Sequence, residues 1–272
     1  RVYHGTWNAA PYQGLYAPRL GMVEEFVLAP EWYVVVATFF GLSLLGLEWA
    51  PLRIFWALFP LAMLIPLMHV FASVRAAAFP EAKGFWERLG LRALTALLFM
   101  VQPLARLRGR LRFGLTPLRK PDVRGWTFPI SQMASCWSEN WRAPEDWLME
   151  LESNARCRVS RVLRGGDFDT WDLELCVGML GGVQVMMSIE EHGGGKELLR
   201  FRVRPRFAPQ WVWVPVSTLT AIVALWSGAP ITGTVFALLA TAIGLTGLRE
   251  AGQAMAAARQ AVQGLAKTVP VK

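Results

Sequence analysis

Charge, cysteine and histidine are all scarce in this sequence. Of the 272 residues, 18% are charged and 54% are hydrophobic, whereas about 25% of the residues of a typical soluble domain are charged. This composition excludes an ordinary soluble protein and indicates that part of the chain lies in a membrane. The three cysteines, Cys136, Cys157 and Cys176, are odd in number and lack CxxC spacing, so neither a disulfide framework nor a zinc site is predicted.

Familiar catalytic motifs are absent from the sequence as well. It contains no GxGxxG, HExxH or GxSxG motif, and the run GGGK at 193–196 lacks the spacing of a phosphate-binding loop. Glu190, Glu191 and His192 stand together at the end of an expected strand, where such groups can bind a metal or transfer protons. Adjacent strand residues point to opposite faces, which favours a solvated turn. No metal site is predicted, and the chain by itself is expected to be non-catalytic.

The balance of charge is positive. The net charge is +8 and the isoelectric point is about 9.9, which indicates either nucleic acid or an anionic membrane surface as a partner. The high apolar content favours the membrane. We therefore expect a lipid bilayer with anionic headgroups as a partner, and no nucleic acid.

Two pairs of apolar segments have the lengths of membrane-spanning hairpins. Residues 31–75 contain uncharged runs over 32–47 and 54–74, separated by a polar break. Residues 210–248 contain a second pair, which turns at 227–230. Because about 20 apolar residues cross a bilayer as a helix, the sequence predicts a polytopic α-helical membrane protein.

A different pattern follows the first hairpin. Residues 84–124 are predicted to form an amphipathic helix lying in the membrane plane, followed by a basic linker. Four arginines fall near one face of this helix, opposite a row of leucines: Arg88, Arg92, Arg106 and Arg110. We expect these four side chains to contact anionic lipid headgroups. Pro103 is expected to kink or end the helix.

The basic residues also predict the topology. Residues 106–124 contain seven Lys and Arg and one acid, and the positive-inside rule places such a loop in the cytoplasm. Two crossings on either side then place the juxtamembrane segment 1–30 and the helical tail 249–272 in the cytoplasm too. We expect this tail to lie on the cytoplasmic surface or to leave it.

Residues 125–207 carry the signals of a small soluble module between the hairpins. Pro144, Glu145 and Asp146 begin a helix as first turns favour, with proline at the start and acids at the positive end of the dipole. Four runs with strand-like character follow between glycine-rich turns: 158–163, 170–176, 183–190 and 197–204. The sequence therefore predicts an inserted α+β domain, made of one helix and an antiparallel four-stranded meander.

An acidic run and a basic run occur on two of these strands. The acids are Asp167, Asp169, Asp172 and Glu174, and the arginines are Arg200, Arg202 and Arg204. An acidic run can attract a cation, but opposite charges on facing strands pair with each other. We expect cross-strand charge pairing between the two runs.

The beginning of the chain resembles a known family. Residues 1–7 (RVYHGTW) and 11–16 (PYQGLY) resemble the stretch that follows the catalytic domain in membrane-bound bacterial family 2 glycosyltransferases. Residues 91–98 (LRALTALL), which run into 102–110 (QPLARLRGR), are similar to a later segment of these proteins. The soluble module shares patterns such as WDLE at 171–174.

The resemblance implies a cytosolic GT-A domain preceding Arg1. That missing N-terminal domain would use a divalent metal and transfer a sugar from a nucleotide-sugar donor to a lipid-linked or polysaccharide acceptor. Because the family's metal-binding and catalytic motifs would precede Arg1, no catalytic residue or cofactor is assigned to this chain. His4, Thr6 and Trp7 are candidates for the acceptor side of the site, by their position alone. The implied location is the bacterial inner membrane, multi-pass, with both ends cytosolic.

Two functions follow from these patterns. The first is the membrane-anchoring and accessory C-terminal part of a glycosyltransferase that builds a polysaccharide or glycolipid at the inner membrane. The second is a subunit of a membrane transport or export assembly, in which the module at 125–207 is a cytosolic docking surface. Loss of transport on deletion of that module would favour the second over the first.

A lipid-binding prediction follows from the arginine face of residues 84–124. A synthetic peptide of residues 84–113 is expected to bind vesicles containing anionic lipid more tightly than neutral vesicles, because each basic side chain near an anionic surface contributes about 1 kcal/mol. Vesicle co-sedimentation measures the difference. Equal binding to both kinds of vesicle would contradict in-plane attachment through the arginines.

Overall fold

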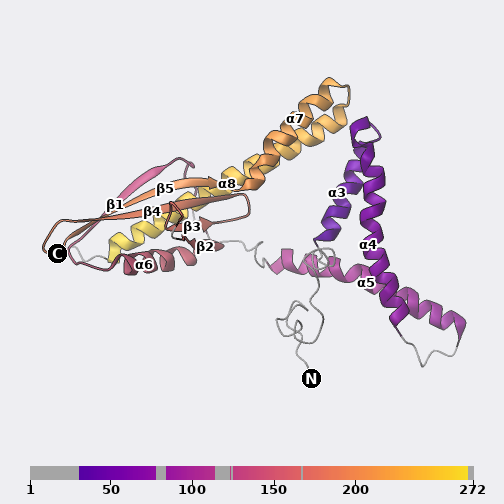
Figure 1. Cartoon of the computed structure of the whole chain (residues 1–272), viewed down its shortest axis with the longest axis horizontal. Helices are drawn as coiled ribbons and strands as arrows, with labels where there is room; N and C mark the ends of the chain where they lie inside the picture. Colours follow the sequence, from indigo (N-terminus) through magenta and orange to yellow (C-terminus); the bar gives the residue numbers. More distant parts are fainter. Residues whose placement is uncertain (1–30, 78–83, 114–122, 124, 167, 269–272) are drawn as a thin grey trace. The chain divides into compact units, whose positions relative to one another are not determined.

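The computed structural model describes residues 31–77, 84–113, 123, 125–166 and 168–268 (Figure 1). The chain divides into two compact units, Arg1–Gly109 and Arg110–Lys272, which are described separately below. The acceptor-side candidates His4, Thr6 and Trp7 lie outside the described residues.

The first unit contains a helical hairpin. Helix α3 (Trp32–Leu45) is followed by the 3-10 turn η1 (Ala50–Ile54) and helix α4 (Phe55–Ala76). Aromatic rings join the two helices, with the ring centroids of Phe39 and Phe55 5.3 Å apart. The first hairpin predicted from the apolar runs is therefore present as a pair of packed helices.

Two indole N–H groups donate hydrogen bonds to backbone carbonyls of this hairpin that have no partner within their own helix. The nitrogen of Pro66 carries no hydrogen and cannot bond the carbonyl of Ala62 one turn earlier, and Trp32 Nε1 donates to that oxygen at 3.0 Å. Trp56 Nε1 donates to the carbonyl of Ser43 at 2.8 Å, in the last turn of α3, where carbonyls lack helical partners. Each bond satisfies a backbone oxygen that a lipid environment would leave unpaired.

Helix α5 (Phe85–Phe113) is one continuous helix. Of the two alternatives expected at Pro103, an end of the helix is wrong, since α5 continues for ten residues beyond it, and a kink stays a prediction. Residues Phe85–Gly109 are long and apolar enough to cross a membrane, as are Ala50–Ala72 and Pro230–Leu265, and these three are the candidates found among the described residues. Three such helices indicate association with a membrane. Whether α5 lies in the membrane plane stays a prediction.

The second unit is built around a five-stranded antiparallel sheet in the order β1-β5-β4-β3-β2. Its strands are β1 (Gln132–Ser138), β2 (Arg161–Arg164), β3 (Leu173–Cys176), β4 (Gly181–Glu191) and β5 (Glu197–Phe207), and helix α6 (Pro144–Arg156) follows β1. The prediction of a four-stranded meander is therefore wrong by one strand. Strand β1 escaped prediction because its larger apolar side chains, Met133 and Trp137, are exposed, while Ala134 and Cys136 face inward.

The hairpin at the end of the chain shares its second helix with the sheet domain. The 3-10 turn η2 (Pro209–Val212) leads into α7 (Trp213–Trp226), and α8 (Pro230–Thr268) is a single helix of 39 residues. The first half of α8 packs along α7, and its second half continues past the hairpin into the sheet domain (Figure 1).

The second half of α8 is core. Ala254, Met255, Ala257, Ala258 and Ala261 are each at most 1% exposed. They pack with α6 and the inward face of the sheet, including Leu173, Val185, Leu199 and Phe201. The expectation that 249–272 forms a surface tail is thus wrong for the part described, up to 268. Alanine has high helix propensity, but here its small side chain also lets the helix lie close to the sheet.

The alanine packing generates a stability prediction. Replacing Ala257, which is fully buried, by Leu is expected to lower the free energy of unfolding by about 1–3 kcal/mol, because extra methylenes in a packed core force neighbours out of position. Urea unfolding followed by tryptophan fluorescence measures this. The matched variant Arg259→Leu, two residues later and exposed, is expected to stay within about 0.5 kcal/mol of the parent. Equal effects would contradict the packing of α8 on the sheet.

Candidate functional site

Helix α8 makes close contacts with the β3–β4 turn at the point where it passes from the hairpin into the sheet domain. Glu250 is the single acidic residue between 208 and 268. Its Oε2 accepts hydrogen bonds from the backbone N–H of Leu180 at 2.7 Å and of Gly181 at 2.9 Å. These two residues lie where β4 begins, so the carboxylate fixes the β3–β4 turn to the helix at the point where the helix enters the domain.

Glycines allow the backbones to approach at this junction. A Cβ at Gly181 would lie 2.5 Å from the backbone nitrogen of Ala251, and one at Gly178 would lie 2.1 Å from the Glu250 carboxylate. On the helix itself, a Cβ at Gly252 would lie 2.0 Å from the indole nitrogen of Trp126. The turn and the indole therefore lie directly on α8, and we name Gly178, Gly181, Glu250 and Gly252 the α8 junction.

A buried carboxylate lies at the opposite end of β5. Glu197 is 1% exposed, and its Oε2 accepts from Trp147 Nε1 at 3.1 Å and from the Arg142 backbone N–H at 3.3 Å. The Arg142 guanidinium lies over the Trp147 ring, 4.8 Å from its centroid, and bonds Glu150 at 2.8 Å. Because every one of these groups is engaged in packing or pairing, the cluster fastens α6 to the sheet and has no free acid or base.

Glu152 on α6 is also buried, and its carboxylate is shared by two arginines. Arg164 of β2 donates to it at 2.7 Å, and Arg156 donates from the next turn of α6. Burial of the carboxylate acts to raise its pKa, but the hydrogen bonds from Arg164 and Arg156 outweigh burial and hold the pKa of Glu152 below its ordinary value. The ion pairs connect α6 to the edge strand β2.

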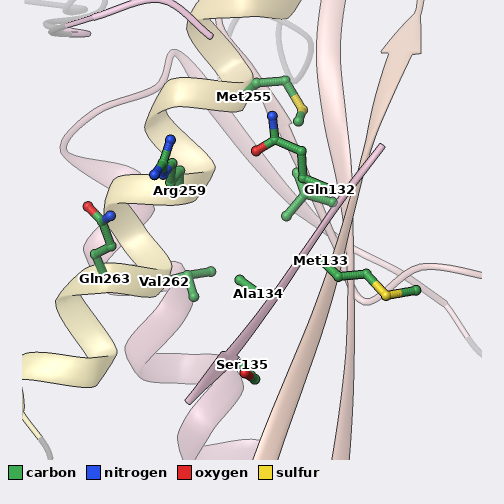
Figure 2. A pocket seen from close by; sticks show the side chains of 9 residues that line it. Gln132, Met133, Ala134, Ser135, Met255, Arg259, Val262 and Gln263 are labelled. Carbon is green, nitrogen blue, oxygen red and sulfur yellow. The ribbon is translucent and has the colours of Figure 1, made fainter. Parts of the chain in front are cut away.

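A groove of about 650 Å³ lies between β1 and α8. Figure 2 shows Ala134 of β1 facing Val262 of α8, with Arg259 and Gln263 along the helix and Met133 directed away from it. Strand β1 is at the sheet edge, so the groove is open along one side. Among the lining residues Ser135 carries a hydroxyl and Arg259 a charge, but no acid, thiol or imidazole is present. The lining has no general acid–base pair.

The predicted lipid-contacting arginines lie on α5. Arg88 and Arg92 are exposed and Arg106 is half-buried, and the spacing of these three along the helix is consistent with one shared face. The position of Arg110 is helical, but its side chain is outside the described part of the structure. The contact with lipid stays a prediction.

The acid and imidazole at the end of β4 do not converge on a metal. Glu190 pairs with Arg200 at 2.8 Å, and the His192 ring lies 5.2 Å from the ring of Trp137. No group of three acidic, histidine or cysteine side chains that could hold a metal is found among the residues described. The arrangement agrees with a turn carrying paired charges.

The predicted pairing of the acidic run with Arg200, Arg202 and Arg204 is wrong among the residues described. Strand β4 lies between β3 and β5, so the two strands that carry the runs are not adjacent. Glu174 instead pairs with Arg206 at 2.8 Å, Asp172 Oδ2 accepts from the Met187 N–H at 2.7 Å, and Asp169 Oδ2 accepts from the Gly166 N–H at 2.8 Å. Asp167 lies outside the described residues.

Comparison with protein-family models, curated proteins and solved structures finds no significant match. The α8 junction is the feature that sequence reasoning missed, although one signal for it was available: a lone carboxylate directly after a long apolar run, with glycines at 178 and 181–182.

The Glu152 ion pairs predict an acid sensitivity. A carboxylate whose pKa is lowered by folding stabilises the folded state fully above its unfolded pKa of about 4.3 and progressively less as the pH falls through the lower folded-state value. Glu152→Gln is therefore expected to be less stable than the parent at neutral pH, and to lose less stability on acidification below about pH 4. Urea midpoints across a pH series measure both effects.

Glu145→Gln is the matched control, because Glu145 is exposed on the same helix. It is expected to follow the parent curve. If the Glu152→Gln curve were parallel to that of the parent at every pH, the ion pairs would have no part in acid sensitivity.

Proposed function

We propose that this chain is the membrane-anchoring and accessory part of a glycosyltransferase, which holds an α+β domain at a fixed position beside the bilayer. The observation that carries the proposal is the continuity of α8, in which one helix of 39 residues belongs both to an apolar hairpin and to the core of the domain. A flexible linker would let the domain move freely relative to the membrane, whereas an unbroken helix does not.

The hairpin half of α8 fits a lipid environment. Ile231, Leu238 and Leu245 are each more than 60% exposed, and exposed apolar surface of this extent is costly in water. The domain half buries its alanines against the sheet. The change of surroundings occurs at the α8 junction, where Arg249 and Glu250 are the first charged residues of the helix.

The transferase part of the proposal is supported by the sequence resemblance at residues 1–7, 11–16 and 91–110. In this proposal a nucleotide-sugar-binding domain with its divalent metal precedes Arg1, the acceptor is lipid-linked or a growing polysaccharide, and the membrane is the bacterial inner membrane with both chain ends cytosolic. The role of the present chain is positional: it keeps donor chemistry and acceptor at the same membrane surface.

The proposal is tested on the complete reading frame that contains this chain. Membranes holding the complete protein are supplied with radiolabelled nucleotide sugars, and transfer to lipid or polymer is measured. Glu250→Ala leaves the N–H groups of Leu180 and Gly181 without their acceptor, at a cost of about 1–3 kcal/mol, and is expected to lower transfer about fivefold or more through loss of positioning.

Glu250→Gln is the matched variant, because it keeps one acceptor oxygen at the same place, and most of the transfer activity is expected to remain. Full transfer by Glu250→Ala would contradict a positioning role for the junction. An upstream reading frame without a nucleotide-sugar-binding domain would refute the transferase proposal itself.

A further inference from the structure

The outer face of the sheet carries a row of arginines that the proposed anchoring role does not use. Arg200, Arg202 and Arg204 alternate along β5, and all three are exposed while Leu199, Phe201 and Val203 between them are buried. Alternate residues of a strand lie about 6.6–6.8 Å apart on one face. We name these three residues the arginine track.

Most of the track has no countercharge. On the neighbouring strands Arg202 lies opposite Met133 and Met186, and Arg204 lies opposite Gln184. Arg200 pairs with Glu190, whereas Arg202 and Arg204 have no ion pair or side-chain hydrogen bond within the described part of the chain. Two guanidinium groups are therefore available to an anionic ligand, held on a rigid strand in a fixed spacing.

The direction of the track restricts the ligand. Strands β4 and β5 and the second half of α8 extend the same way from the α7–α8 hairpin (Figure 1), and β5 ends at Phe207, directly before η2 and α7. Arg204 is thus nearest to the hairpin and Arg200 is farther from it. The three guanidinium groups follow the strand in one line, which suits a ligand that is itself an extended chain.

One aromatic ring continues the row on the outer face. On β1, Ser135 lies opposite Arg200. Trp137 lies two residues further along β1 and therefore points to the same outer face. Trp137 is 41% exposed, its indole N–H donates to Glu139 at 2.7 Å, and the His192 ring lies against it edge-on with the ring centroids 5.2 Å apart. The exposed part of such an indole can stack on the apolar face of a sugar.

We propose that the arginine track binds a linear anionic glycan, with its carboxylates on Arg202 and Arg204 and a sugar ring on Trp137. Guanidinium groups bind carboxylates through two parallel hydrogen bonds. Single-stranded nucleic acid is a poorer match, since its bases stack on several aromatic side chains and the described strands present Trp137 as the one exposed aromatic on this face. The inference rests on the proposed function, because it names the chemical class of the polymer handled at the membrane.

The test uses the full chain in nanodiscs of neutral lipid and a fluorescent oligogalacturonate as the probe, with anisotropy as the readout. The parent chain is expected to bind the probe, and Arg202→Gln/Arg204→Gln is expected to raise Kd about tenfold, as loss of two exposed charge-assisted contacts predicts. Trp137→Leu is expected to raise Kd a few-fold by removing the stacking surface.

Arg158→Gln/Arg259→Gln is the matched control, since it removes the same net charge from α8 and from the segment after α6. It is expected to bind within about twofold of the parent. Equal weakening by the two double variants would overturn the proposal, because binding would then follow net charge alone. So would tighter binding of a neutral oligosaccharide, of polyuridine RNA or of anionic vesicles through Arg202 and Arg204.

The assay contains no nucleotide-sugar donor, so it reads the track separately from the transfer reaction. A chain that supports transfer but does not bind the anionic probe would overturn this inference and leave the anchoring function in place. Unchanged urea midpoints for the variants would show that the exposed substitutions have not unfolded the domain.

Discussion

The structure depends on one helix being compatible with two solvents. Along α8 the exposed leucines of the hairpin give way to alanines packed on a sheet, with no break in the backbone. Where the leucines give way to the alanines, the Glu250 carboxylate accepts hydrogen bonds from two backbone N–H groups. Glycines in the β3–β4 turn let that turn lie against the helix. Without this junction the hairpin and the domain would be two independent bodies joined by a linker.

Three tryptophans also donate hydrogen bonds to oxygens that would otherwise lack a partner. Trp32 and Trp56 donate to carbonyls left open in the α3–α4 hairpin by a proline and a helix end. Trp147 donates to the buried Glu197. Trp147 is fully buried, whereas Trp56 is half exposed, but each of these three indole N–H groups satisfies an oxygen that would otherwise lack a partner. Among the described residues Trp211 is the exception, since its buried indole nitrogen has no hydrogen-bond partner.

The parts of the fold that could be predicted from the sequence are those with a strong local period. Apolar runs located the α3–α4 and α7–α8 hairpins, and alternation located β5, where arginine and large apolar residues exchange at every position. What local pattern cannot reveal is the partner of a segment. The alanines after Arg249 have the composition of an exposed helix, yet a sheet far earlier in the chain covers them. Strand β1 points its larger side chains outward, and the intervening β4 decides which charges face each other across the sheet.

The order of the elements along the chain affects the assembly of this domain, because α8 follows all five strands. All five strands and α6 are synthesised before α8, and the chain emerges from its N-terminal end first. The apolar face of the sheet therefore stays partly uncovered until the alanines of α8 have been synthesised. Residues Pro230–Leu265 form an apolar stretch of 36 residues, about 54 Å as a helix, while a hydrocarbon core is about 30 Å thick. Helix α8 is thus longer than a bilayer crossing needs, and its first charged residues, Arg249 and Glu250, stand where its packing changes from α7 to the sheet.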